Sequence, residues 1–231
     1  MRAVVFRRHG GPEVLESAEV SEPSQGPDEL LVRVKACSVN HLDLWIRQGI
    51  LAYPLRLPHI SGCDVAGVVE RVAPGVTQVK PGERVVLAPG LSCGDCSWCR
   101  GGQDNLCRSY GIRGAATDGG YAELTVARAT DAIPLPAGLS FEEAAAFPLV
   151  FLTAWHMLVT RATLQAKETV LVHAAGSGIG HAAVQIAKYL KATVYATVGS
   201  EAKVAKAEAL GADEVINYQR EGFEERVKTL T

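Results

Sequence analysis

Four cysteines stand close together in one short segment of the sequence, with the spacing C-x2-C-x2-C-x7-C: Cys93, Cys96, Cys99 and Cys107. Four thiolates can hold a structural zinc ion at tetrahedral corners, and gaps of two residues let a tight turn direct successive sulfurs to one point. Because protein ligands would fill all four positions, the spacing predicts a structural zinc rather than a catalytic one. A pair of disulfides and unligated thiols are the alternatives. The sequence shows no secretory signal, which favours zinc.

A run of small residues, AAGSGIG at 174–180, lies between a predicted strand at 169–173 and a predicted helix at 179–190. Small residues let the backbone approach a pyrophosphate, and a helix N-terminus presents free N–H groups to its negative charge. The glycine spacing departs from G-x-G-x-x-G, and such a turn can also serve helix–strand packing alone. Its place between a strand and a helix favours a dinucleotide site. The candidate residues are Ala175, Gly176, Ser177, Gly178, Ile179 and Gly180.

The end of the second predicted strand, at 193–198, bears on the choice of cofactor. An NAD site usually holds an acidic residue there, which accepts a hydrogen bond from the ribose 2′-hydroxyl. Here the strand runs into Gly199 and Ser200, and Glu201 and Lys203 follow on a predicted helix. A hydroxyl and a cation suit a 2′-phosphate, so Ser200 and Lys203 favour NADPH, with NADH as the alternative. Lys203 could equally be a solvated helix residue.

The elements that must position these residues fall into two groups. Before residue 130 the chain predicts short strands, including 32–36, 65–72 and 84–88, in an irregular and mostly antiparallel barrel from which the cysteine segment projects. A linker is predicted at 131–138. Beyond it, strands at 169–173, 193–198 and 214–217 alternate with helices at 179–190, 201–210 and from about 221. This βαβαβα series is the first half of a doubly wound fold. We therefore predict an α/β protein with domains at 1–130 and 131–231.

Composition and charge argue against several classes of function. The 231 residues suffice for two modest domains, and 48% hydrophobic with 21% charged residues is ordinary for a globular protein. The formal net charge is −2 and no basic block occurs, so nucleic acid and membrane surfaces are not expected as partners. No signal peptide or transmembrane segment is recognisable, which predicts a cytoplasmic protein.

Several short segments together resemble the medium-chain dehydrogenase/reductase superfamily, in its zinc-type alcohol dehydrogenase and quinone oxidoreductase branch. They are GPEVL at 11–15, LPHISG at 57–62, VAPGV at 72–76, PGERV at 81–85 and GGYAE at 119–123. The resemblance implies a GroES-like catalytic domain followed by a Rossmann domain, with the active site in the cleft between them. The cysteine segment at 93–107 resembles the structural zinc lobe of that family.

The resemblance also locates the positions at which zinc alcohol dehydrogenases hold a catalytic metal. The first Cys of that set corresponds to Asn40, the His-Glu pair to Cys63 and Asp64, and the second Cys to Leu149. Cys63 and Asp64 alone would not give the three protein ligands that a catalytic zinc normally has. We therefore expect one structural zinc and no catalytic zinc.

The pattern Asn40-x-x-Asp43 resembles the quinone oxidoreductase branch. There Asn40 would donate a hydrogen bond to the nicotinamide or to the substrate oxygen, and Asp43 would orient the pocket. Thr153 would lie near the nicotinamide, and Tyr218 with Lys203 near the adenosine phosphate. The structural alternatives are that Asn40 caps a turn and that Asp43 begins a helix.

The expected function is hydride transfer between NAD(P)H and a small quinone, enone or carbonyl/alcohol substrate, without a catalytic zinc. The alternatives are a zinc-dependent alcohol dehydrogenase with altered ligands and a non-catalytic module that binds a partner through its zinc lobe. The resemblance also favours a homodimer. Only three strands of the doubly wound fold precede Thr231, so we expect a chain shortened at its C-terminus, with little or no activity from these 231 residues alone.

Overall fold

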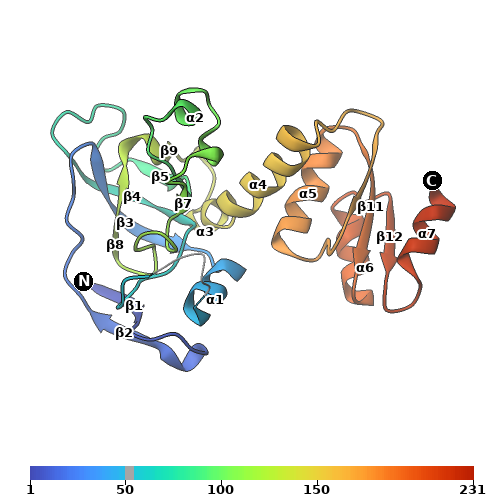
Figure 1. The fold of residues 1–231 in the computed structure, drawn as a ribbon, viewed down its shortest axis with the longest axis horizontal. Helices are drawn as coiled ribbons and strands as arrows, with labels where there is room; N and C mark the ends of the chain where they lie inside the picture. Colours follow the sequence, from blue (N-terminus) through green and yellow to red (C-terminus); the bar gives the residue numbers. More distant parts are fainter. Residues whose placement is uncertain (50–54) are drawn as a thin grey trace. The chain divides into compact units, whose positions relative to one another are not determined.

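A computed structural model describes residues 1–49 and 55–231, and its contacts separate two units, Met1–Leu149 and Val150–Thr231 (Figure 1). This division lies further along the chain than the boundary predicted after residue 130. The predicted linker at 131–138 is wrong, because strand β9 (Ala132–Pro134) pairs antiparallel with β5 (Arg84–Leu87). After it, helix α3 (Phe141–Ala145) packs two buried alanines against β4 of the same unit.

The first unit is built on a five-stranded antiparallel sheet in the order β8-β3-β4-β5-β9. Its central strands, β3 (Glu29–Cys37) and β4 (Val65–Val72), agree with the prediction, and β8 spans Leu124–Arg128. In β3 the buried Val32 alternates with exposed Arg33 and Lys35, as expected of a half-buried strand. The predicted irregular and mostly antiparallel β architecture is confirmed, although among the described residues β8 and β9 end an open sheet and do not pair with each other.

Shorter elements surround this sheet. Strands β1 (Arg2–Phe6) and β2 (Leu15–Glu19) form a hairpin around the 3-10 turn η1 (Pro12–Val14). Helix α1 (His41–Gln48) ends at Gly49, whose φ of 92° is a left-handed conformation that glycine adopts without strain. The remaining elements of this unit are β6 (Gly90–Leu91), α2 (Ser97–Arg100), η2 (Asp104–Leu106), β7 (Gly111–Ile112) and η3 (Ala129–Asp131).

The second unit has three parallel strands in the order β10-β11-β12, spanning Thr169–Val172, Thr193–Val198 and Glu214–Asn217. Helices α5 (Gly178–Tyr189), α6 (Glu201–Ala209) and α7 (Phe223–Leu230) alternate with them and pack against them (Figure 1). The predicted βαβαβα series is therefore confirmed, as the start of a Rossmann-like domain. Helix α4 (Pro148–Trp155) and the π-helical turn η4 (His156–Arg161) precede β10.

The core of the second unit explains why its helices lie close to the strands. Residues Ala182, Ala183 and Ala187 of α5 are buried beside Val194 and Ala196 of β11. Side chains of one or a few carbons let the helix approach the sheet at short range. No helix within residues 1–49 and 55–231 has both the length and the apolar character that a membrane span requires.

Candidate functional site

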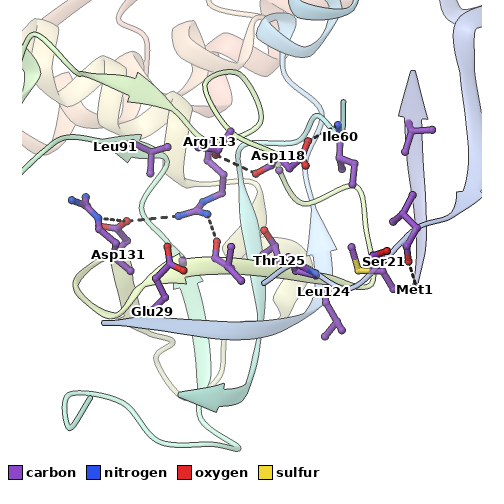
Figure 2. Close-up of a pocket in the computed structure, with 18 of the residues that line it drawn as sticks. Met1, Ser21, Glu29, Ile60, Leu91, Arg113, Asp118, Leu124, Thr125 and Asp131 are labelled. Atoms are coloured by element: carbon purple, nitrogen blue, oxygen red, sulfur yellow. Dashed lines mark hydrogen bonds and ion pairs between the residues drawn. The ribbon is translucent and has the colours of Figure 1, made fainter. Parts of the chain in front are cut away.

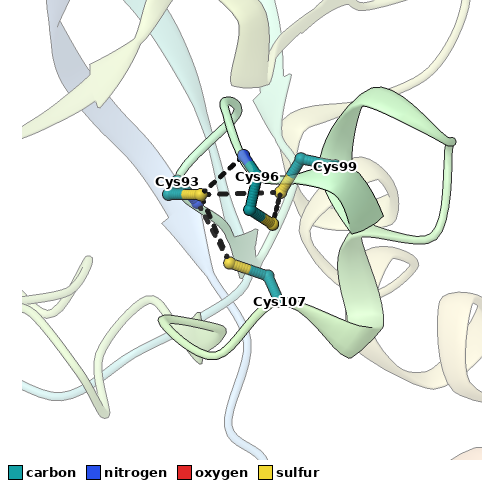
Figure 3. A group of neighbouring side chains, drawn as sticks. All are labelled: Cys93, Cys96, Cys99 and Cys107. Atoms are coloured by element: carbon teal, nitrogen blue, oxygen red, sulfur yellow. Dashed lines mark hydrogen bonds between the residues drawn. The ribbon is translucent and has the colours of Figure 1, made fainter.

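The four cysteines predicted to bind zinc converge in the structure (Figure 3). Their Sγ atoms all lie within 4.8 Å of one another, with 3.5 Å between Cys96 and Cys99 and 3.5 Å between Cys93 and Cys107. Four sulfurs about 2.3 Å from one zinc ion would be about 3.8 Å apart, so this group fits a tetrahedral ion. In the described part of the chain, it is the one group of three or more Cys, His, Asp or Glu side chains close enough to share a metal.

Local structure directs these sulfurs to one point. The short pair of strands β6 and β7 closes the base of the segment, and Gly94 and Gly102 adopt left-handed φ values of 80° and 70° in its turns. Backbone N–H groups of Asp95 and Cys96 lower the pKa of the Cys93 thiol to about 6. Since the thiolate is the metal-binding form, the lowered pKa leaves Cys93 mostly ionised at neutral pH, which favours zinc binding.

The positions that correspond to a catalytic zinc site also lie together, but hydrogen bonds join them. Asn40 Nδ2 donates to Asp64 Oδ2 at 2.9 Å and lies 3.4 Å from Cys63 Sγ. The backbone N–H of Leu149 donates to Asp64 Oδ1 at 2.9 Å. Burial raises the pKa of both the Cys63 thiol and the Asp64 carboxyl, and the hydrogen bonds from Asn40, Leu149 and Ser38 partly oppose the increase at Asp64. An amide and a leucine thus stand where two thiolates would be needed.

Asp43 has a structural task in this network. Its Oδ2 accepts hydrogen bonds from the Asn40 backbone N–H at 2.7 Å and from the Tyr121 hydroxyl at 2.9 Å. Its Oδ1 accepts from the Gly62 backbone N–H at 3.0 Å. Asp43 therefore holds the start of α1 against the segment that contains Cys63, which agrees with the helix-start alternative. Sequence reasoning missed Tyr121 and Ser38, whose contacts depend on the packing of strands distant in sequence.

The glycine-rich turn lies between β10 and α5, as predicted. Ser177 is the N-cap residue of α5, and its Oγ accepts a hydrogen bond from the Gly180 backbone N–H at 3.0 Å. In the described chain no acceptor is present for the backbone N–H groups of Gly178 and Ile179, which a helix start leaves available for an anion. Ala175 is buried beneath the turn. The turn therefore fits a pyrophosphate.

The residues predicted at the adenosine end gather beside this turn. A Cβ added at Gly176 would lie 2.8 Å from Lys203 Cδ, so the lysine stem covers that glycine. The Tyr218 hydroxyl lies against Gly199, and Ser200 is the N-cap residue of α6 without capping it through its side chain. These contacts place the candidates at the carboxyl ends of parallel strands, where doubly wound folds bind ligands.

The sequence did not predict an ion pair between Arg220 and Glu201 in this region. Arg220 Nη1 lies 3.2 Å from Glu201 Oε2, and Asn217 Nδ2 donates to the same oxygen at 3.3 Å. Glu201, the acidic residue that follows β11, is therefore already bound by the Arg220 guanidinium and the Asn217 amide. Thr153, the remaining catalytic candidate, is half-buried on α4 in the second unit.

A cavity of about 650 Å³ lies elsewhere in the first unit, lined by residues that include Met1, Ile60, Arg113, Leu124 and Asp131 (Figure 2). None of the predicted site residues lines it. The Arg113 side chain is buried at its wall, where Nη1 donates to the Val126 carbonyl at 2.6 Å and Nη2 lies 3.8 Å from Asp131 Oδ2. Because Nε and Nη2 of Arg113 are fully buried without a hydrogen bond, the cavity does not offer them to a ligand.

We expect Gly180→Ala to abolish dinucleotide binding and to destabilise the second unit. A Cβ at position 180 would overlap the Ala174 carbonyl oxygen and lie 2.8 Å from Ala175 Cα, so backbone would have to move. Overpacking of this kind typically costs about 1–3 kcal/mol. The matched control is Gly222→Ala, because nothing lies within 4 Å of a Cβ there and its φ is −70°. Thermal unfolding and cofactor titration measure both effects. Unchanged cofactor binding by Gly180→Ala would contradict the role of this glycine-rich turn as the dinucleotide site.

Comparison with known proteins agrees with this architecture. The family model described as alcohol dehydrogenase GroES-like domain matches residues 26–137, and the one described as zinc-binding dehydrogenase matches residues 178–231. An alcohol dehydrogenase of Geobacillus stearothermophilus is 39% identical over 231 residues, which are 99% of this chain and 67% of that protein. Quinone oxidoreductase 1 of Escherichia coli (strain K12) is 36% identical over 228 residues, which are 99% of this chain and 62% of that protein.

Solved structures show the same similarity. A crystal structure described as an NAD-dependent alcohol dehydrogenase superposes with a TM-score of 0.96 and 52% identity, covering 100% of this chain and 67% of that one. Escherichia coli quinone oxidoreductase complexed with NADPH gives a TM-score of 0.80 and 35% identity, covering 100% and 62%. A GroES-like unit with a four-cysteine lobe, followed by the start of a Rossmann-like unit, defines a dehydrogenase/reductase architecture. The chain belongs to the medium-chain dehydrogenase/reductase family, and it spans about two thirds of the length of these relatives.

Proposed function

We propose that the protein is an NAD(P)H-dependent oxidoreductase that transfers a hydride between the nicotinamide and a small quinone, enone or carbonyl/alcohol compound. The observation that carries this proposal is the turn at 174–180, with its helix N-terminus and with Lys203 and Tyr218 beside it. The names of the relatives support the reaction class, since they include both alcohol dehydrogenases and quinone oxidoreductases.

We further propose that the reaction proceeds without a catalytic zinc. The support is chemical: Asn40 and Leu149 offer no thiolate or imidazole, and the Asp64 carboxylate is occupied by three hydrogen bonds. A zinc-dependent alcohol dehydrogenase with altered ligands is the second candidate, because the relative at 52% identity is an alcohol dehydrogenase. Metal counting separates the two, since the first predicts one zinc per chain and the second predicts two. The non-catalytic module predicts no response to either cofactor.

The bound cofactor would supply the hydride, and the residues of this chain would bind and orient it. The N–H groups at the start of α5 would hold the pyrophosphate, with Ser177 fixing the turn through Gly180. Lys203 would contact the adenosine phosphate, with Ser200 and Tyr218 beside it. In a site without zinc, polarisation of the substrate depends on hydrogen bonds and on fixed dipoles.

Titration with NADPH and NADH tests this proposal, and we expect tighter binding of NADPH. Lys203→Ala should weaken NADPH binding by about 10- to 100-fold, which corresponds to the loss of one charge-assisted hydrogen bond, and should change NADH binding little. Lys206→Ala is the matched control, since Lys206 is also exposed and lies one turn further along α6. Tryptophan fluorescence reports the binding. Tighter binding of NADH, or equal losses for both cofactors, would contradict the preference for NADPH.

A further inference from the structure

The peptide bond between Ser92 and Cys93 connects the four-cysteine cluster to a charged side chain outside it. The carbonyl oxygen of this peptide, on Ser92, accepts a hydrogen bond from Arg128 Nη1 at 2.6 Å. The N–H of the same peptide, on Cys93, donates to Cys107 Sγ at 3.5 Å (Figure 3). In a planar trans peptide the C=O and N–H bonds point in opposite directions. The guanidinium that holds the carbonyl therefore also directs the N–H toward the sulfur of Cys107.

Arg128 is itself held in place by a buried carboxylate. Its Nε and Nη2 donate to Oδ2 and Oδ1 of Asp131 at 3.1 and 2.9 Å, in a planar fork that leaves Nη1 for Ser92. Arg128 is the last residue of β8, and the Asp131 backbone carbonyl accepts a hydrogen bond from the Ala88 N–H at 2.8 Å. The guanidinium is therefore fixed on the five-stranded sheet, at the point where the chain enters the segment 93–107.

The positive charge of Arg128 also suits a site that holds zinc. Four thiolates and one Zn²⁺ ion together carry a net negative charge, which a nearby cation stabilises. The hydrogen bond to Asp131 is the main cause that raises the pKa of the Arg128 guanidinium, and the negative charge of Cys99 adds to it. Arg128 therefore lies within electrostatic reach of the cluster, in addition to its contact with the peptide.

We propose that Arg128 is a positioning residue for the zinc cluster, which acts through the Ser92–Cys93 peptide on the Cys107 thiolate. A hydrogen bond from a backbone N–H stabilises the thiolate, which is the form that binds zinc. Groups that orient metal ligands without touching the metal typically change the metal affinity by about 10- to 100-fold when they are replaced. The inference concerns the segment 93–107 and its support, so it is independent of the proposed oxidoreductase activity.

The first test is the zinc affinity of Arg128→Met, measured by competition with a chelator. This substitution removes the guanidinium and keeps an apolar stem, and we expect the affinity to fall by about 10- to 100-fold. Arg33→Met is the matched control, because Arg33 Nε and Nη2 form the same fork with Glu70, each at 2.9 Å. The side chains of Arg33 and Arg128 are also similarly exposed, at 44% and 36%. The Arg33 fork joins β3 to β4 within the sheet, so its loss should leave the zinc affinity unchanged.

The second test separates positioning from a general structural role, by amide hydrogen exchange in the zinc-loaded, 15N-labelled protein. The Cys96 N–H is the internal reference, because it donates to Cys93 Sγ at 3.4 Å within the same cluster and belongs to a different peptide. In Arg128→Met we expect the Cys93 N–H to exchange about 10-fold faster, the effect of one hydrogen bond, while the Cys96 N–H keeps its rate.

Arg128→Lys is the second variant, because it keeps a cation beside Asp131 and is therefore expected to fold. A lysine ammonium cannot reproduce the planar fork and hold the Ser92 carbonyl at the same time. We expect the same selective increase in exchange at Cys93. Unchanged zinc affinity in both variants, or equal acceleration of exchange at Cys93 and Cys96, would overturn the inference. A wild-type protein that binds no zinc would overturn it together with the zinc site itself.

Discussion

Replacing Cys99 by serine is expected to reduce bound zinc from one ion per chain to essentially none. Cys99 Sγ lies 3.5 Å from Cys96 Sγ and 3.8 Å from Cys93 Sγ, so its loss removes one corner of the tetrahedral set. Binding of a structural zinc supplies folding free energy directly, about 10–16 kcal/mol in isolated zinc-finger peptides. The segment 93–107 contains no long helix or extended sheet to replace that contribution. We therefore expect the substitution to unfold this lobe.

Metal analysis and thermal unfolding measure the two effects, and treatment with a strong chelator should reproduce both in the wild type. Cys37→Ser is the matched control, because burial raises the pKa of the Cys37 thiol to about 12 and Cys37 is not part of the cluster. One retained zinc in Cys99→Ser would show that the metal lies elsewhere. Two tightly held zinc ions in the wild type would refute the proposal that the catalytic zinc is absent.

The second large effect is expected from Asp131→Asn, which should destabilise the first unit by about 3–5 kcal/mol. The buried Asp131 carboxylate accepts two hydrogen bonds from Arg128, at 3.1 and 2.9 Å, and forms an ion pair with Arg113 (Figure 2). The Arg113 side chain is only 3% exposed, and burial lowers the pKa of its guanidinium. Removing the carboxylate would leave a buried cation without its ion-pair partner, which is far more costly than losing an exposed pair.

A double variant separates charge from packing at this cluster. Arg113→Met removes the buried cation, two of whose nitrogens form no hydrogen bond, while filling similar space. Asp131 keeps Arg128 as its ion-pair partner, so this substitution alone should change the free energy of unfolding by less than about 1 kcal/mol. Combined with Asp131→Asn, it should recover a large part of the lost stability. Urea unfolding measures all three proteins. A cost below about 1 kcal/mol for Asp131→Asn would mean that this pair is solvated or replaceable.

Local sequence patterns predicted much of the fold, because strands and helices depend largely on the conformational preferences of neighbouring residues. The strands at 65–72, 193–198 and 214–217 have the predicted bounds, since β-branched runs between turn residues favour extended backbone. The predicted linker failed at Ala132–Pro134, where pairing with β5 decides the conformation. Whether the irregular barrel closes also lay beyond local patterns, because closure depends on pairing between strands far apart in sequence, and among the described residues β8 and β9 end an open sheet.

The sequence by itself determined the candidate zinc cluster and the glycine-rich turn proposed to bind the nucleotide. Each is a short segment in which residue type and spacing nearly fix the geometry, as the convergence of Cys93 and Cys107 shows. Only the tertiary structure decided what Asn40 and Asp43 do. Their partners Asp64 and Tyr121 come from segments more than 20 residues away, so no local pattern could show the contact of Asn40 with Asp64 or that of Asp43 with Tyr121. Residue types show which groups can react, but the neighbours that folding brings together set the direction of each donor and acceptor.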